Sequence, residues 1–165
     1  MKKRIKNADS LEMLRTGEQF FKCANLCIEK GNEMSYACMN CVTPAAVNAA
    51  LSCEIFLKLL LYLHEIEYPK EHRLKELFKE LPRVIKENIK ADTIKRYGSW
   101  ENLWGIAHLD NVSNTFNDWR YNFEHDFSKE RMMRLEMGFL FALMETLKDE
   151  CNKYFEIYIN GGRKR

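Results

Sequence analysis

Apolar residues recur three and four positions apart along most of this chain, which is the spacing of the buried face of an α-helix. Residues that interrupt helices are scarce, because the 165 residues include only 7 glycines and 3 prolines. Leucine, glutamate and lysine, which favour helices, are abundant. The pattern therefore predicts an all-α protein.

Capping residues and helix breakers predict where the helices begin and end. Asp9 or Ser10 can cap a first helix, which we expect to end at Gly31-Asn32. Further helices are predicted to begin at Thr43-Pro44, His72, Pro82 and Ser99, with Gly98 as a helix end, Asp110-Asn111 as a loop, and a last helix from about Lys129 to Tyr158.

The helix predicted over residues 44–65 is apolar nearly all round, which is typical of the central helix of a bundle. Glu54 and Lys58 are its charged exceptions, four residues apart in the favourable order for a helix ion pair. A membrane span would carry a heavy cost for both charges, so we expect a buried helix and no membrane partner. A buried Glu54 needs a partner, and Arg120 is a candidate.

The stretch from Asp118 to Asp126 gathers an arginine, a histidine and carboxylates among aromatic residues. An imidazole such as that of His125 titrates near neutrality and can move protons. A guanidinium such as that of Arg120 can hold a phosphate oxygen and stabilise transition-state charge. These two side chains are what metal-free chemistry on a phosphodiester requires. The structural alternative is that the aromatics are core and that Arg120 and Glu124 form a helix ion pair.

The geometry of a straight helix separates the two groups. At 100° per residue, Arg120 and His125 point roughly 140° apart. They converge only if the helix ends near Glu124 or if two copies of the protein face each other. Ser128 resembles a fresh helix cap, which favours a helix end near Asp126.

Length and charge favour one ordinary domain spanning residues 1–165, with flexible basic tails at 1–7 and 160–165. A net charge of +2 from interspersed charges is not typical of a protein that coats nucleic acid. The sequence shows no pattern of a secretory signal, and six cysteines then indicate reduced thiols in the cytoplasm. Cys23, Cys27, Cys38 and Cys41 could share a zinc ion, but the spacing between the two pairs is short and unusual for such a site, and Cys23 and Cys27 also fit a core face. We therefore expect no metal.

Three motifs resemble those of the HEPN family, the helical domains named for higher eukaryotes and prokaryotes nucleotide-binding. They are the acidic, lysine-bearing apolar segment at 49–61, the histidine-led segment at 72–78, and the arginine motif at 116–121 followed by Glu124 and His125. Together they cover about residues 45–127 in the order that the family shows.

The resemblance implies a four- to five-helix up-and-down bundle with short additional helices, usually a homodimer. In the family's ribonucleases an arginine and a histidine with four to six residues between them form the active site at the dimer cleft, and Arg120 and His125 have four between them. The implied activity is RNA cleavage without a metal or other cofactor, of the toxin or defence type, with Arg120 and His125 catalytic. Supporting or binding roles fall to Glu54, Lys58, His72, Tyr121 and Glu124.

The resemblance also implies an alternative. The Trp-Arg-Tyr variant, seen here at 119–121, occurs in members that lack the histidine, where Glu54, Lys58, His72 and Arg120 correspond to a structural or small-ligand cluster. Such a module would bind a nucleotide or a nucleotidyltransferase-like partner without catalysis. A third hypothesis is a purely structural helical protein.

Overall fold

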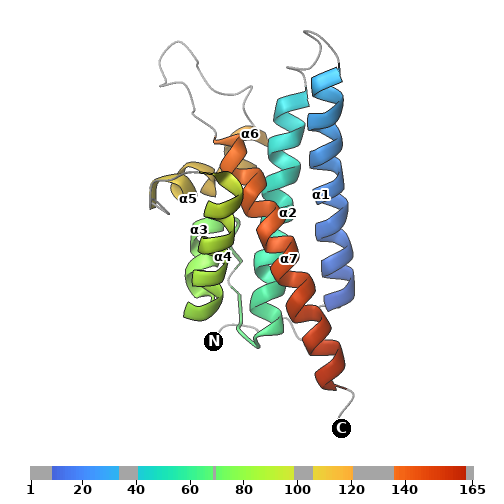
Figure 1. The fold of residues 1–165 in the computed structure, drawn as a ribbon, viewed down its shortest axis with the longest axis vertical. Helices are drawn as coiled ribbons and strands as arrows, with labels where there is room; N and C mark the ends of the chain where they lie inside the picture. Colours follow the sequence, from blue (N-terminus) through green and yellow to red (C-terminus); the bar gives the residue numbers. More distant parts are fainter. Residues whose placement is uncertain (1–8, 34–40, 69, 99–105, 121–135, 163–165) are drawn as a thin grey trace.

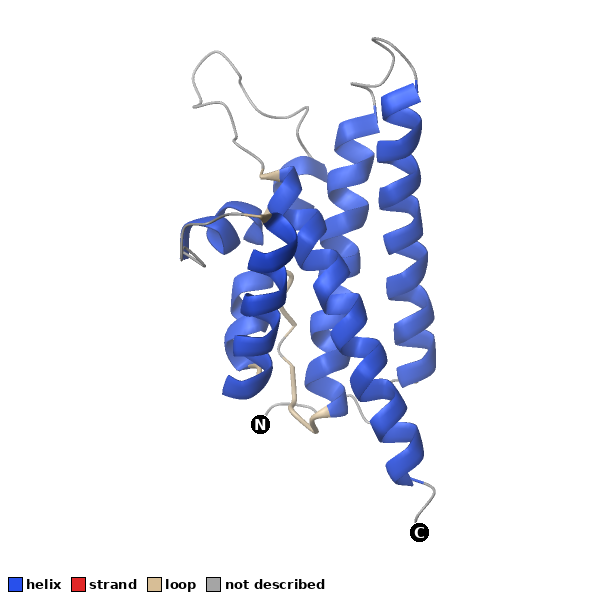
Figure 2. Cartoon of the chain, in the orientation of Figure 1, coloured by secondary structure: helices blue, strands red, loops and turns tan. Residues whose placement is uncertain are grey.

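The computed structural model describes residues 9–33, 41–68, 70–98, 106–120 and 136–162, and these contain helices and no strand (Figure 2). In chain order the helices are α1 (Ser10–Glu33), α2 (Val42–Leu63), α3 (Leu74–Glu80), α4 (Arg83–Tyr97), α5 (Ile106–Ser113), α6 (Thr115–Arg120) and α7 (Met137–Gly162). The predicted all-α bundle with short additional helices is confirmed.

Helix α2 is the centre of the bundle. It packs against α1, α7, α6 and α3, and Figure 1 shows α1, α2 and α7 running alongside one another. Within the described residues α2 alone is long and apolar enough to cross a membrane, yet 61% of its most apolar stretch is buried inside the protein. That burial is what the central helix of a bundle shows.

The packing of α1 on α2 depends on a close approach at Gly17. The Ser52 hydroxyl donates a 2.9 Å hydrogen bond to the Gly17 carbonyl, and the Phe56 ring lies directly over the glycine. A Cβ atom at Gly17 would stand 2.5 Å from Cε1 and 2.8 Å from Cδ1 of Phe56, which is fully buried. The absent side chain therefore makes room for the ring.

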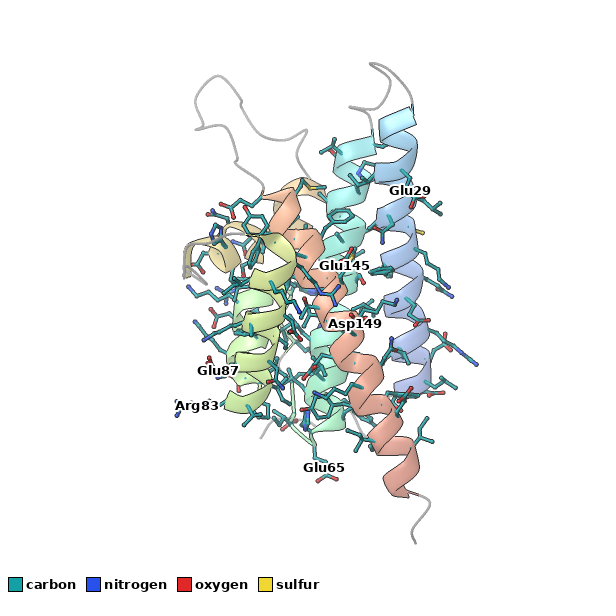
Figure 3. The ribbon with its side chains drawn as sticks, in the orientation of Figure 1. Glu29, Glu65, Arg83, Glu87, Glu145 and Asp149 are labelled. Atoms are coloured by element: carbon teal, nitrogen blue, oxygen red, sulfur yellow. The ribbon has the colours of Figure 1, made fainter. Side chains whose placement is uncertain are left out.

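Helix α4 is joined to α7 by charges at their surface. Arg96 donates to Glu145 at 3.3 Å and to Asp149, both of which Figure 3 labels on α7. At its end, α4 is closed by Gly98 in the left-handed conformation, with φ 73°, as the sequence predicts.

Several predicted boundaries are wrong. Asp9 does cap α1, but the helix continues through Gly31-Asn32 to Glu33. Helix α2 begins at Val42 rather than Thr43-Pro44, and its N-cap residue Cys41 makes no side-chain capping bond. Helix α7 runs past Tyr158 to Gly162, so 160–162 are helical rather than part of a tail.

The predicted loop at Asp110-Asn111 lies inside α5. Both residues favour turns because their side chains compete for nearby backbone groups. Here those side chains have tertiary partners instead. Lys75 pairs with Asp110 at 2.5 Å, and the Asn111 amide donates to Glu136 at 3.2 Å. The local preference for a turn is thereby overridden.

His64 lies at the opposite end of α2 from Cys41, where its backbone N–H closes the helix. Its ring packs edge-on against Tyr154, with the centroids 4.7 Å apart, and its Nε2 is buried without a hydrogen-bond partner among the described residues. Burial lowers the pKa of His64 from its ordinary value of 6.5, while the nearby Glu150 carboxylate opposes that shift. The neutral imidazole is therefore the form that the fold accommodates.

We predict that Gly17→Ala destabilises the protein. Alanine gains about 1 kcal/mol of helix propensity, but overpacking against Phe56 costs about 1–3 kcal/mol, so we expect a net loss of about 1 kcal/mol in urea unfolding. Adding Phe56→Leu to Gly17→Ala should remove the clash, so the two effects should not add. Gln19→Ala, exposed on the same helix, is the control and should change stability by less than about 0.5 kcal/mol. A stabilised Gly17→Ala protein would contradict the close packing.

We also predict that His64 makes the stability of the folded protein depend on pH. Because its pKa is lower in the folded chain than in the unfolded chain, the unfolded state binds the proton first, and stability is lost as the pH falls through 6.5. His64→Phe keeps a ring against Tyr154 but does not titrate. Urea unfolding between about pH 8 and 5 should show a shallower loss for this variant than for the wild type. If the wild type and His64→Phe lost stability with pH at the same rate, His64 would be excluded as a source of the pH dependence.

Candidate functional site

Glu54 is a buried carboxylate on the central helix. Only 6% of the residue is exposed, and one of its oxygens, Oε1, has two partners. Lys58 Nζ lies 2.7 Å from Oε1, one turn further along α2, and His72 Nδ1 lies 3.0 Å from the same atom. The structure therefore brings together three of the residues predicted for the site.

The other oxygen of Glu54, Oε2, is buried and has no hydrogen-bond partner among the described residues. A carboxylate oxygen removed from water without a partner carries a free-energy cost of about 1–3 kcal/mol or more. This is the strongest sign that the cluster serves something besides the core.

The Lys58 ammonium contacts a carboxylate and lies near an aromatic ring. Its side chain is 18% exposed, its ammonium pairs with Glu54, and it lies 5.9 Å from the centre of the Tyr68 ring. The Coulomb attraction of the pair and the ring electrons both stabilise the cation at the edge of the core.

A tight turn before α3 positions His72. The Glu71 carboxylate accepts the backbone N–H groups of His72 and Arg73 at 2.9 and 3.0 Å and the Arg73 guanidinium at 2.7 Å. These bonds, the one to the Arg73 side chain first, lower the pKa of Glu71 to about 2. The lowered pKa favours the ionised carboxylate, which is the form that accepts these hydrogen bonds.

The His72 ring is oriented toward solvent on one side. Its side chain is 57% exposed although Nδ1 faces Glu54. Since an ionised carboxylate only accepts hydrogen bonds, a neutral His72 carries its proton on Nδ1 and leaves Nε2 with a free lone pair. The ring centroid lies 6.0 Å from that of Phe116 on α6.

Helix α6 is placed beside this cluster by two neighbouring helices. The Ser113 hydroxyl at the end of α5 accepts the Lys75 backbone N–H at 3.0 Å, which ties α5 to α3. The Thr115 hydroxyl then donates to the Val112 carbonyl at 2.8 Å, so α6 starts directly after α5 and packs against α2. Arg120 is the last residue of α6.

The remaining predicted site residues are described less fully. The backbone of Arg120 is helical, while its side chain lies outside the described residues, as do Tyr121, Glu124 and His125. The proposed pairing of Arg120 with Glu54 therefore stays a prediction. Cys38 also lies outside them, so the four-cysteine alternative is not tested, and no three potential ligands gather as a metal set among the described residues.

Sequence reasoning missed a second polar cluster. His108 pairs with Glu136 through Nδ1, stacks on Phe139 with centroids 5.3 Å apart, and meets the Tyr97 ring edge-on. The partners come from α4, α5 and the start of α7, so no spacing in the sequence could indicate them. By contrast, the four-residue spacing of Glu54 and Lys58 predicted their ion pair, which is confirmed.

We predict that Glu54→Gln costs about 2–3 kcal/mol of stability, because it leaves the Lys58 ammonium without its counterion in a mostly buried position. Adding Lys58→Met should restore part of the loss by removing that unpaired charge. The matched control is Glu76→Gln, which breaks the exposed pair with Lys79 and should cost less than about 0.5 kcal/mol. Equal losses in urea unfolding would contradict a special role for the buried pair.

Comparison with known proteins agrees with this architecture. A family model described as the HEPN domain matches residues 10–135, which includes α1 to α6 and the whole Glu54, Lys58 and His72 cluster. No curated protein and no solved structure gives a significant match. Because the family model covers most of the chain, the protein belongs to the HEPN domain family.

Proposed function

We propose that this protein is a metal-independent endoribonuclease of the toxin or defence type that acts as a homodimer. The observation that carries the proposal is the unpartnered Oε2 of Glu54, buried beside the helix that ends at Arg120. A guanidinium is the donor that best fits such an oxygen, because it presents several N–H groups in a fixed plane. We also propose that the protein is cytoplasmic, where thiols are kept reduced in the absence of an oxidant.

Glu54 would orient Arg120 rather than react. Its Oε1 is already held by Lys58 and His72, so the carboxylate is fixed before an arginine approaches Oε2. A guanidinium held on one edge keeps its other N–H groups for a phosphate oxygen. That geometry supports stabilisation of the charge that develops on the phosphate.

The reaction follows from these roles. The RNA 2′-hydroxyl attacks the adjacent phosphorus while His125 accepts its proton, and Arg120 stabilises the pentacoordinate phosphorane. The bond from phosphorus to the 5′-oxygen then breaks, and that oxygen takes up a proton, leaving a 2′,3′-cyclic phosphate and a 5′-hydroxyl. We favour two copies facing each other, because the family resemblance implies an active site at a dimer cleft, to which each copy would bring Arg120 and His125.

The second candidate function is a non-catalytic module that binds a nucleotide or a nucleotidyltransferase-like partner. The specific observation in its favour is that Glu54, Lys58 and His72 form a cluster among themselves, with both Lys58 and His72 on one oxygen of Glu54. The exposed side of His72 and the nearby Lys58 can serve a phosphate-bearing ligand equally well.

We predict RNA cleavage in the presence of EDTA, with cyclic phosphate ends on the products. His125→Ala should lower the rate at least 100-fold, as expected for loss of a general acid–base group, with an unchanged circular dichroism spectrum. Arg120→Lys should also lower it, since a single ammonium cannot hold Glu54 and a phosphate together. Arg83→Ala, which removes an exposed arginine of α4, is the control for charge.

The wild type and variants at Arg120 and His125 also distinguish the ribonuclease from the binding module. No cleavage by wild type, together with a nucleotide-dependent rise in melting temperature that Arg120→Ala abolishes, would replace the nuclease by the binding module. Cleavage that survives His125→Ala would contradict the proposed catalytic pair.

A further inference from the structure

A group of thiols lies where α1 ends and α2 begins, away from the Glu54 cluster. Cys23 is exposed, and Cys27 and Cys41 are half-buried, whereas Cys53 and Cys151 are fully buried. The two helices stand side by side at this end of the molecule, which Glu29 on α1 marks in Figure 3.

The register between the helices brings Cys27 level with Cys41. The hydrogen bond from Ser52 to the Gly17 carbonyl places Ser52 and Gly17 at the same level along the two helix axes. Cys27 lies ten residues after Gly17 on α1, and Val42 lies ten residues before Ser52 on the antiparallel α2. Both helices rise about 1.5 Å per residue, so Cys27 comes level with Val42, and Cys41 directly precedes it.

Cys27 also lies on the side of α1 that faces α2. Ala24 follows the buried Gly17 by seven residues and Cys27 follows the buried Ala24 by three, which is a helical stripe. Burial, and then the proximity of Cys41 and Cys23, raise the pKa of Cys27. Packed helix axes are about 8–10 Å apart, which leaves facing Cα atoms within the range that a disulfide spans.

We propose that Cys27 and Cys41 are a redox pair that forms a reversible disulfide when the protein meets hydrogen peroxide. The bridge would enclose residues 28–40 in a covalent ring and fasten the C-terminal part of α1 to the start of α2. This proposal is independent of the proposed ribonuclease activity.

The oxidation balances in two steps. The Cys41 thiolate attacks peroxide, so that a sulfur–oxygen bond forms, the oxygen–oxygen bond breaks and one water leaves. Cys27 sulfur then attacks the sulfenic sulfur of Cys41, so that the disulfide forms and a second water leaves. Two thiols lose two electrons in total, and the peroxide is reduced to water. Cys41 reacts first because the raised pKa of Cys27 keeps that residue protonated.

Two other cysteines serve as internal controls. The Cys151 thiol lies 3.3 Å from the Phe56 carbonyl oxygen, and the Cys53 thiol 4.0 Å from that of Leu140, both in the core. Burial raises the pKa of each, and neither is exposed to solvent. They should stay reduced while the native fold persists.

The experiment uses the full chain, first reduced and then treated with an equimolar amount of hydrogen peroxide. We expect the thiol count measured after denaturation to fall from six to four, with the chain still monomeric on a non-reducing gel, and dithiothreitol to restore it. Six remaining thiols, or a bridge between chains, would overturn the proposal.

Serine variants identify the bridged residues. Trypsin leaves Cys23 and Cys27 together in peptide 23–30, and Cys38, Cys41 and Cys53 together in peptide 31–58, so mass alone does not assign the link. Cys27→Ser and Cys41→Ser should each abolish the linked peptides, whereas Cys23→Ser, Cys38→Ser and Cys53→Ser should retain them. A link that survives Cys27→Ser or Cys41→Ser would assign the bridge to one of the other three cysteines and refute the pair.

Discussion

The ion pair of Glu54 and Lys58 is the constraint around which the bundle is arranged. A charged carboxylate inside an apolar helix costs several kcal/mol of desolvation unless donors surround it. Lys58 supplies one donor from the same helix, and His72 supplies another from the turn before α3. The charge therefore requires that α3, and through it α5 and α6, pack at this level of α2 and at no other. A buried polar group here specifies position more sharply than apolar packing does.

The other buried residues of α2 specify the positions of the neighbouring helices much less sharply. Its buried residues are mostly alanine and leucine, which pack against almost any apolar surface. Two local features restrict that freedom on the side of α1: the missing side chain at Gly17 admits the Phe56 ring, and Ser52 bonds to the Gly17 carbonyl. Together they fix the sliding register of the first two helices, and that register is what brings Cys27 level with Cys41.

The sequence predicted what depends on neighbours along the chain. Helical periodicity gave the helices, Gly98 gave a left-handed helix end, and the four-residue spacing gave the Glu54–Lys58 pair. It failed where partners come from distant segments. Asp110 reads locally as a turn residue, yet Lys75 holds it in a helix. His72 is separated from Glu54 by 18 residues and a turn, so only the folded chain shows that one oxygen accepts both Lys58 and His72.

The buried cluster and the proposed catalytic histidine lie in different parts of the chain, which bears on how the HEPN family could include both catalytic and non-catalytic members. Glu54, Lys58 and His72 are held by α2 and by the turn that Glu71 closes, and none of those bonds involves the stretch that contains His125. If His125 transfers the proton as we propose, a substitution there would remove that step and leave the contacts of Lys58 and His72 with Glu54 in place. A substitution at Glu54 would instead break both contacts and lower the stability of the fold. On this proposal the buried cluster is required for folding and the histidine for chemistry, so the two can be lost separately.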